Sequence, residues 1–296
     1  MKRTLIAMTL LAMCCGSAFA AVGLEPASGY VHLPDAQVVK AGSIEGFAAY
    51  LTTHGTNELG RVTTFEAACD GNGYTVGAVG GIGKGLELGV GYTNIDKAIG
   101  TANAFAVAAK WKFVERPESG LAVALGAAYR NWNSDMHIAD AVPFSGPVAL
   151  DLPAVTSFYV AADKAFKPSA GSQCLVSGTI GLTYDSYSSS HLSSLGGGPF
   201  EGVDVPISPE GVVASDSFIS PFIGIRADAP KWSVLGEFRP ALENGGFSYQ
   251  SILWSLAVRG QIGESSSASV GVSTFNLPYT RSTPAFFLEL THRFGR

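Results

Sequence analysis

Residues 284–294 read Pro-Ala-Phe-Phe-Leu-Glu-Leu-Thr-His-Arg-Phe, and this short stretch separates into two faces. One face is almost wholly apolar and takes every second residue: Phe286, Leu288, Leu290, His292 and Phe294. The other face is more polar and consists of Phe287, Glu289, Thr291 and Arg293. Because successive side chains of a strand point to opposite sides of a sheet, the alternation predicts a β-strand between an apolar and a polar environment.

The same alternation recurs along the chain, interrupted by Gly, Pro, Ser and Asn. In residues 102–114, for example, Phe105, Val107 and Trp111 alternate with small or polar residues. We expect twelve strands, near residues 43–54, 73–81, 85–95, 102–114, 119–132, 155–167, 173–187, 215–228, 231–241, 249–263, 266–276 and 284–294. Pro221 lies inside one of them and cannot donate to a strand ladder, so we expect a bulge there or a later strand start.

The connections between these strands fall into two classes of length. Short ones follow every second strand, at residues 83–85, 116–118, 167–171, 229–231 and 263–265, whereas long ones span 55–72, 133–154 and 188–214. Short turns at one end and long loops at the other are typical of bacterial outer-membrane barrels. We therefore expect an all-β fold, a closed antiparallel transmembrane β-barrel of about 12 strands with short periplasmic turns and long extracellular loops. A secreted β-sandwich is the alternative, but it gives no reason for the segregated loop lengths.

The N-terminus has the composition of a secretory signal peptide. Lys2 and Arg3 precede an apolar stretch at residues 5–13, and small residues flank a cleavage site after Ala20. A lipoprotein signal is the alternative because Cys14 follows, yet the bulky Met13 stands where that signal has a small residue. We therefore expect a signal peptide at residues 1–20, a periplasmic or lumen-inserted segment at 21–42, and an outer-membrane barrel at 43–296.

Composition and charge restrict the partners. Charged residues make up only 15% of the chain, against about 25% in typical soluble domains. Of 19 basic and 24 acidic residues, two basic ones leave with the signal peptide, so the mature chain has 17 against 24 and a net charge of −7. That charge argues against nucleic acid as a partner. We expect outer-membrane lipid and lipopolysaccharide to surround the barrel.

The faces opposite the apolar ones indicate what the lumen contains. The third to seventh strands turn mostly Gly, Ala, Ser and Thr inward, whereas the last five strands carry these lumen-lining candidates: Arg226, Glu237, Arg239, Arg259, Glu289 and Arg293. An Arg or Lys on the lipid face would cost about 2–4 kcal/mol at mid-depth, which favours a lumenal position. Two interpretations remain open, a water-filled passage and a paired Arg–Glu network that braces a closed barrel.

Two resemblances add to this interpretation. The last strand, with Phe286, Leu288, Leu290 and Phe294, resembles the C-terminal assembly signal of outer-membrane barrels and implies recognition by the barrel-assembly machinery; Gly295 and Arg296 after the final Phe are a departure. Residues 24–46, with Gly29, Pro34 and Ala36, and the glycine-rich stretch 83–92 resemble YjbH-like outer-membrane proteins. That second resemblance implies a barrel associated with exopolysaccharide production or export.

Few residues suggest chemistry. His191 and Ser193 resemble the His–Ser pair of outer-membrane phospholipases, where His activates a Ser nucleophile, but the Asn-Gly that follows there is Ser194-Leu195 here. We expect no catalytic site, no cofactor and no metal site, since no cluster has a specific ligand spacing. Cys69 and Cys174 are assigned to opposite ends of the barrel, so we expect no disulfide between them.

The first functional hypothesis is a non-enzymatic channel or export accessory in the outer membrane, with polysaccharide as the class of solute that the resemblance implies. The second is a structural or surface-interaction barrel that acts through its long loops. A lipid hydrolase that uses His191 and Ser193 is the third. Single-channel conductance separates the first two, and labelling with a serine-reactive probe tests the third.

Overall fold

The computed structural model describes residues 27–58, 64–65, 71–97, 100–138, 148–166, 174–188, 190–194, 212–213, 215–244, 247–250, 252–274, 281–283 and 285–295. All regular elements among them are β-strands. This part of the chain contains no helix that is long and apolar enough to cross a membrane. The signal peptide predicted at residues 1–20 lies outside the described residues.

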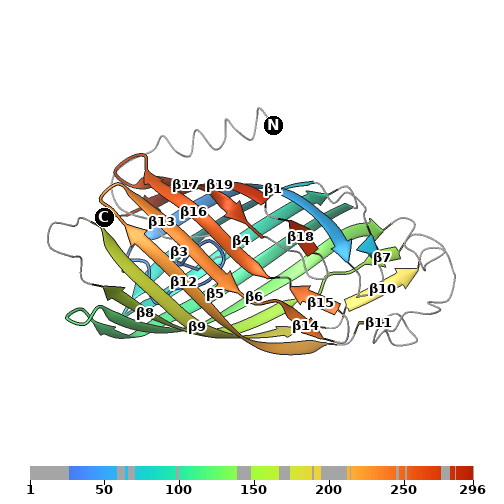
Figure 1. The fold of residues 1–296 in the computed structure, drawn as a ribbon, viewed down its shortest axis with the longest axis horizontal. Coiled ribbons are helices and arrows are strands. Elements are labelled where there is room, and N and C mark those ends of the chain that lie inside the picture. Colours follow the sequence, from blue (N-terminus) through green and yellow to red (C-terminus); the bar gives the residue numbers. More distant parts are fainter. Residues whose placement is uncertain are drawn as a thin grey trace.

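Twelve long strands form the wall (Figure 1): β1 (Ile44–Glu58), β3 (Gly71–Gly83), β4 (Leu86–Lys97), β5 (Gly100–Arg116), β6 (Leu121–Ile138), β8 (Val155–Phe166), β9 (Leu175–Tyr187), β12 (Asp216–Asp228), β13 (Trp232–Arg239), β16 (Leu253–Gln261), β17 (Ser266–Ser273) and β19 (Ala285–Phe294). Each pairs antiparallel with the next, and β19 pairs with β1 from Phe294↔Ile44 to Phe287↔Leu51. The predicted closed antiparallel transmembrane barrel of 12 strands is thereby confirmed.

Short elements extend the barrel or lie beside it: β2 (Thr64–Phe65), β7 (Val148–Leu150), β10 (Ser190–Ser194), β11 (Val212–Val213), β14 (Leu242–Asn244), β15 (Phe247–Gln250) and β18 (Arg281–Thr283). They gather at the end where the long connections run, and the opposite end, called the short-turn end below, holds the turns at 84–85, 117–120, 229–231 and 262–265 (Figure 1). The tightest turn is Lys84-Gly85, where both residues have positive φ angles of 52° and 76°. Such a pair favours a two-residue hairpin.

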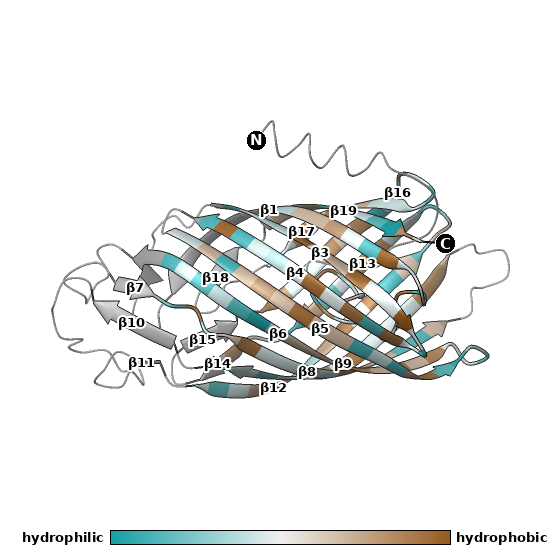
Figure 2. Cartoon of the chain, turned by 180° about the vertical axis from the view of Figure 1, so that it is seen from behind, coloured by the Kyte–Doolittle hydropathy of each residue, from teal (hydrophilic) through white to brown (hydrophobic). Residues whose placement is uncertain are grey.

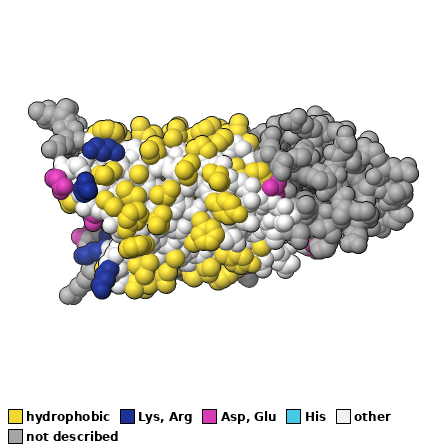
Figure 3. Space-filling view, turned by 90° about the horizontal axis from the view of Figure 1, so that it is seen from below, with side chains coloured by type: hydrophobic (Ala, Val, Ile, Leu, Met, Phe, Trp, Pro, Cys, Tyr) yellow, Lys and Arg dark blue, Asp and Glu magenta, His cyan; other side chains and the backbone are white. Residues whose placement is uncertain are grey.

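The outer face of the wall is apolar. Along the strands brown and teal residues alternate in Figure 2, and exposed apolar side chains cover the middle of the face shown in Figure 3. Aromatic residues flank this belt at the short-turn end, where Trp111 is 50% and Phe166 53% exposed, and at the opposite end, where Tyr92 is 39% and Tyr184 42% exposed. Aromatic rings at both margins of an apolar belt are expected where a barrel meets the two membrane interfaces.

The wall tolerates Pro221 without a break. β12 runs continuously through it, and Pro221 stays in register opposite Leu182 of β9, so the expected bulge or later strand start is wrong. The reason lies on the other side, where the pairing of β12 with β13 begins only at Ile223. A strand that is paired on one side only can lack an N–H there without loss of a ladder bond.

Candidate functional site

The inner face of the wall has two kinds of surface. On β5 small residues predominate, with Ala102, Ala104, Ala106 and Ala108 all buried, and Lys110 continues the same face. From β12 to β19 it carries the six charged residues proposed from the sequence: Glu237, Arg239, Arg259 and Glu289 are buried, and Arg226 and Arg293 are half-buried. All six occupy positions that alternate with exposed or half-exposed residues of the outer face.

Each of the four arginines in this set has a carboxylate partner. Arg226 lies 3.1 Å from Asp35 and 2.9 Å from Asp228. Arg239 lies 2.9 Å from Asp185, and Arg259 lies 3.7 Å from Glu289. Arg293 Nε donates to Glu45 Oε1 at 2.6 Å. Ion pairs therefore run along the inner wall, as the network interpretation expects, yet one partner, Asp35, comes from outside the wall.

Asp35 belongs to residues 27–43, which lie inside the barrel and are called the plug segment below. This segment enters at the short-turn end, where Gly42 N–H donates to Gly81 O (2.8 Å), and folds back on itself in the lumen through a turn at residues 29–34. Tyr30 N–H donates to Leu33 O at 2.9 Å across that turn. Tyr30, Val31 and Leu33 are 2%, 1% and 4% exposed, so the tip is almost fully enclosed.

Glu237 of β13 holds the tip of the plug segment. Its carboxylate accepts the backbone N–H groups of Val31, His32 and Leu33 at 3.3, 3.0 and 2.9 Å. The Ser255 hydroxyl from neighbouring β16 donates to the same carboxylate. Successive backbone N–H groups that converge on one carboxylate form a strong anion-binding concavity, so Glu237 satisfies three donors that the tight turn leaves without a ladder partner.

A second polar cluster lies nearer the short-turn end, around Lys110 of β5. The Lys110 ammonium lies 3.3 Å from both Asp35 of the plug segment and Glu87 of β4. It also donates to the carbonyl of Ser28 at 2.7 Å. The plug segment has two limbs, one before the turn at residues 29–34 and one after it. Glu87 in turn accepts the N–H groups of Ser28 (2.9 Å) in the first limb and Val39 (2.8 Å) in the second. The two limbs are thus joined to one another through the wall.

Glycines shape the seat of the plug segment. A Cβ atom at Gly224 of β12 would lie 2.5 Å from the ring of Tyr30, and the Tyr30 hydroxyl is 2.7 Å from Thr179 Oγ1. A Cβ atom at Gly81 of β3 would lie 2.3 Å from the carbonyl oxygen of Val39. Backbone approach this close requires glycine, so the inner wall is contoured to these residues of the segment.

Apolar contacts complete the seat. Leu33 packs with Phe222, Leu253 and Ala161, Ala36 with two alanines of β6, and Val39 with Phe47 and Val79. His32 Nε2 lies 2.5 Å from Ser273 Oγ at the far end of β17. Burial, together with the positive charges of Arg130 and Arg239, lowers the pKa of His32 to about 3, so its imidazole is neutral at physiological pH.

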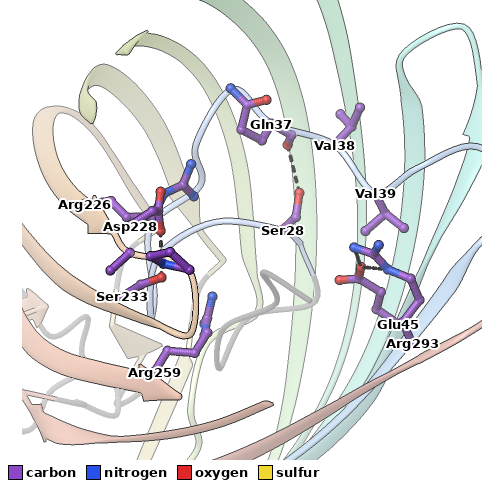
Figure 4. A pocket seen from close by; sticks show the side chains of 12 residues that line it. Ser28, Gln37, Val38, Val39, Glu45, Arg226, Asp228, Ser233, Arg259 and Arg293 are labelled. Atoms are coloured by element: carbon purple, nitrogen blue, oxygen red, sulfur yellow. Dashed lines mark hydrogen bonds and ion pairs between the residues drawn. The ribbon is translucent and has the colours of Figure 1, made fainter. Parts of the chain in front are cut away.

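A cavity of about 400 Å³ remains between the plug segment and the wall at the short-turn end. Figure 4 shows its polar lining, with Ser28 and Gln37 of the segment on one side and Arg226, Asp228 and Arg259 of the wall on another. Ser28 Oγ donates to Gln37 O at 2.8 Å, which ties the two limbs together across the lumen. The plug segment thus occupies the lumen here, and charged side chains of the wall border the cavity that remains beside it.

Sequence reasoning missed several charged residues of the site: Asp35, Glu87, Lys110, Asp163 and Asp185. The last four alternate in phase with inward Gly, Ala, Ser or Thr, and that phase was the available signal. Asp163 accepts from Thr179 (2.7 Å) and from Gln37 (3.1 Å), so it also touches the plug segment. Asp35 carried no signal, because the plug segment has no alternation from which to read a direction.

The remaining candidates lie away from the lumen cluster. Phe286, Leu288 and Phe294 of the suggested assembly signal are 64%, 41% and 47% exposed on the outer face, with Leu290 between them half-buried. His191 and Ser193 belong to β10, whose side chains lie outside the described residues. Among the described residues, no group of three or more His, Cys, Asp or Glu could hold a metal ion.

Comparison with known proteins identifies the architecture. No family model and no curated protein matches the chain. An outer-membrane channel from Pseudomonas putida F1 is similar in structure, with a TM-score of 0.52, 11% identity, and coverage of 88% of this chain and 98% of that one. The β domain of the Bordetella autotransporter Brka matches with a TM-score of 0.48, 13% identity and coverage of 84% and 98%. The Pseudomonas putida toluene transporter TodX matches with a TM-score of 0.41, 8% identity, and coverage of 94% of this chain and 98% of that one.

Proposed function

We propose that this protein is a non-enzymatic outer-membrane channel or export accessory whose lumen is closed at rest by the plug segment. The observation that carries the proposal is that a separate piece of chain, rather than the side chains of the wall, fills the lumen. Barrels of about eight strands are filled by their own side chains, whereas wider ones leave space for a ligand, a plug or water.

The polar inner wall supports a passage for polar solutes. Withdrawal of the plug segment would expose Glu237, Lys110, Glu87 and Arg226 to the lumen. A barrel with only a structural role would be more stable with apolar residues at these positions, because buried charges cost desolvation energy that their pairing only partly returns. In the closed state these charged groups would pair with the plug segment, and in the open state water in the lumen would hydrate them. The same wall could therefore hold the plug and line a polar passage.

The outer membrane is the location that the architecture supports. An apolar belt with aromatic margins, short turns at one end and long connections at the other fits this membrane. The secretory leader expected at residues 1–20 supplies the route. For the class of solute, the resemblance at residues 24–46 supports exopolysaccharide, and that stretch contains the plug segment. Cell-surface polysaccharide in a deletion strain, with and without complementation, tests that narrower proposal.

Planar-bilayer conductance tests the channel itself. The mature protein should give rare or no conductance steps, and a variant that lacks residues 27–38 should give frequent ones. Both proteins must first migrate faster on a gel unheated than boiled, since a stable barrel shows this shift and a misfolded one does not. Silence from both folded proteins would contradict a channel and favour a structural or surface-interaction barrel that acts through its long loops.

A further inference from the structure

The outer wall contains a groove that the channel proposal does not use. It crosses β8, β9, β12, β13 and β16, has a volume of about 670 Å³, and is bordered by Phe166, Ile180, Ile223, Ile225, Phe238 and Trp254. Apart from Trp254, which is half-buried, these side chains are 43–66% exposed, and all project from the outer face. The volume lies within the roughly 300–1,000 Å³ typical of small-molecule sites.

Two glycines form the floor of this groove. Gly178 of β9 and Gly236 of β13 both face outward and are paired on either side of Ile225 of β12. On the inner wall, a Cβ at Gly81 or Gly224 would clash with the plug segment, but no such clash explains Gly178 and Gly236. A Cβ at Gly178 would have no neighbour closer than 3.8 Å, and one at Gly236 would meet only Ile225 Cγ2 at 3.4 Å.

The backbone does not explain these glycines either. Neither has a positive φ angle, and the pairings of β9 with β12 and of β12 with β13 run without a register shift. Glycine within a strand is unfavourable compared with a β-branched or aromatic residue, and it often marks a bulge, a tight bend, or a site where a ligand or another backbone approaches closely. Two such glycines side by side within one groove fit a ligand that approaches from the membrane side.

One end of the groove carries a positive charge. Lys164 of β8 borders the groove, is exposed, and is paired directly with Gly178. Its ammonium donates to the carbonyl of Ser119 in the turn at 117–120, which fixes it at the short-turn end. An ammonium has three donors, so two remain for another acceptor. A lysine on the lipid face is tolerated near the interface, at the level of the lipid headgroups.

We propose that this groove binds one phospholipid of the periplasmic leaflet, with an acyl chain over Gly178 and Gly236 and the phosphate at Lys164. The apolar lining matches a hydrocarbon chain, and the ammonium lies where a headgroup phosphate would be. Phospholipid is chosen over lipopolysaccharide because the charged end of the groove lies at the short-turn, periplasmic side. The bound lipid would fill space that the wall leaves empty and would stabilise the β9–β12–β13 region.

Trp254 supplies a reporter inside the groove. In a variant with Trp111→Phe, Trp132→Phe and Trp232→Phe, quenching of Trp254 is measured in phosphatidylcholine vesicles that contain increasing fractions of phosphatidylethanolamine with brominated acyl chains. The reference is a matched variant that keeps only Trp111, an exposed residue on β5. Half-quenching of Trp254 should need a brominated fraction at least about threefold lower than that for Trp111, a ratio worth roughly 0.7 kcal/mol.

Substitutions in the groove test whether the quenching of Trp254 arises from lipid bound there. Gly178→Leu with Gly236→Leu should fill the groove and move the Trp254 curve onto the Trp111 curve, and Lys164→Gln should move it part of the way. Gly260→Leu is the control, because a Cβ there has no neighbour within 4 Å and Gly260 does not line the groove. Coincident Trp254 and Trp111 curves without these groove substitutions would overturn the proposal. So would a dimer in native mass spectrometry that Gly236→Leu dissociates, since a second copy would then cover the groove.

Discussion

The two faces of the wall are built from alternating residues of the same strands but meet different requirements. Outward residues of β13 outside the groove, such as Trp232, contact a fluid environment, so any large apolar side chain serves. Inward residues of the same strand, such as Glu237, meet one defined partner with fixed donors. The outer face is therefore specified by residue class and the inner face by individual contacts.

Glycine shows the same difference at two neighbouring positions. Gly224 of β12 faces inward, and its missing Cβ admits the ring of Tyr30. Gly236 of β13 is paired with Ile225, the next residue of β12, and faces outward, where a Cβ would meet only Ile225 Cγ2 at 3.4 Å. The first glycine is explained by a part of the chain itself, and the second calls for something outside the chain.

The largest effect is expected from Glu237→Ala, because it leaves three backbone N–H groups of the plug segment without an acceptor. Loss of hydrogen bonds to a charged group at a buried site should weaken seating of the segment by about 2–4 kcal/mol, or roughly 30-fold or more. The measurement is the rate at which a polar maleimide labels Val31→Cys in a background with Cys69→Ser and Cys174→Ser. Val31 is 1% exposed, so labelling reports withdrawal of the segment.

Glu289→Gln is the matched control for that experiment. Glu289 is a fully buried lumen carboxylate, but the contacts described for it are to Arg259, Ser269 and Thr291 of the wall. Its substitution should leave the labelling rate of Val31→Cys within about threefold of the unmodified protein, a change below about 1 kcal/mol. Equal acceleration by both substitutions would mean that lumen charge in general, and not the Glu237 contact, seats the segment.

Gly224→Val compared with Gly236→Val gives the next largest effect. The inward valine would occupy the place of the Tyr30 ring, and overpacking of this kind costs about 1–3 kcal/mol. We expect faster labelling of Val31→Cys in the first variant and no change in the second. An equal change in the labelling rate for both variants would contradict the claim that only the inner face is fitted to the plug segment.

Phe294→Ala and Phe287→Ala compare the two faces of the final strand. Phe294 is 47% exposed on the outer face at the short-turn end, and Phe287 is 3% exposed in the lumen. Removal of the outer ring loses about 1–2 kcal/mol of apolar transfer and alters the suggested assembly signal, so Phe294→Ala should lower the heat-modifiable fraction in membranes more. Lower assembly of Phe287→Ala would show that lumen packing, not the outward signal, limits insertion.

The smallest effect is expected from reduction of the native cysteines. Cys174 precedes β9 at the short-turn end, and Cys69, outside the described residues, lies two positions before β3 begins at the other end. The hydrocarbon core is about 30 Å thick, and a disulfide needs Cα atoms within roughly 7 Å. Mass spectrometry of non-reduced protein should therefore find no Cys69–Cys174 peptide, and reductant should not change stability.

The strands were predictable from sequence because lipid imposes a period of two. All twelve expected segments correspond to long strands, with shifted ends: β13, for example, ends at Arg239 rather than at 241. The seven short strands of the described residues, such as β7 and β10, were not predicted, because they are too short to show an alternation. The direction of Glu237 followed from the same period. The partners of Glu237 could not be predicted in this way, because Val31, His32 and Leu33 lie more than 200 residues away and belong to a segment without alternation. Lys110 was overlooked among the alanines of β5 although it shares their phase.

Closure of the lumen by residues 27–43 is tested most directly by conductance through a barrel whose plug segment can be fixed and released. His32→Cys and Ser273→Cys replace side chains that are 2.5 Å apart, and a short bifunctional thiosulfonate would join them in a Glu237→Ala background with Cys69→Ser and Cys174→Ser. Bilayers should show no conductance steps from the cross-linked protein and frequent steps from the same molecules after reductant is added. Equal conductance before and after reduction would contradict a lumen closed by this segment.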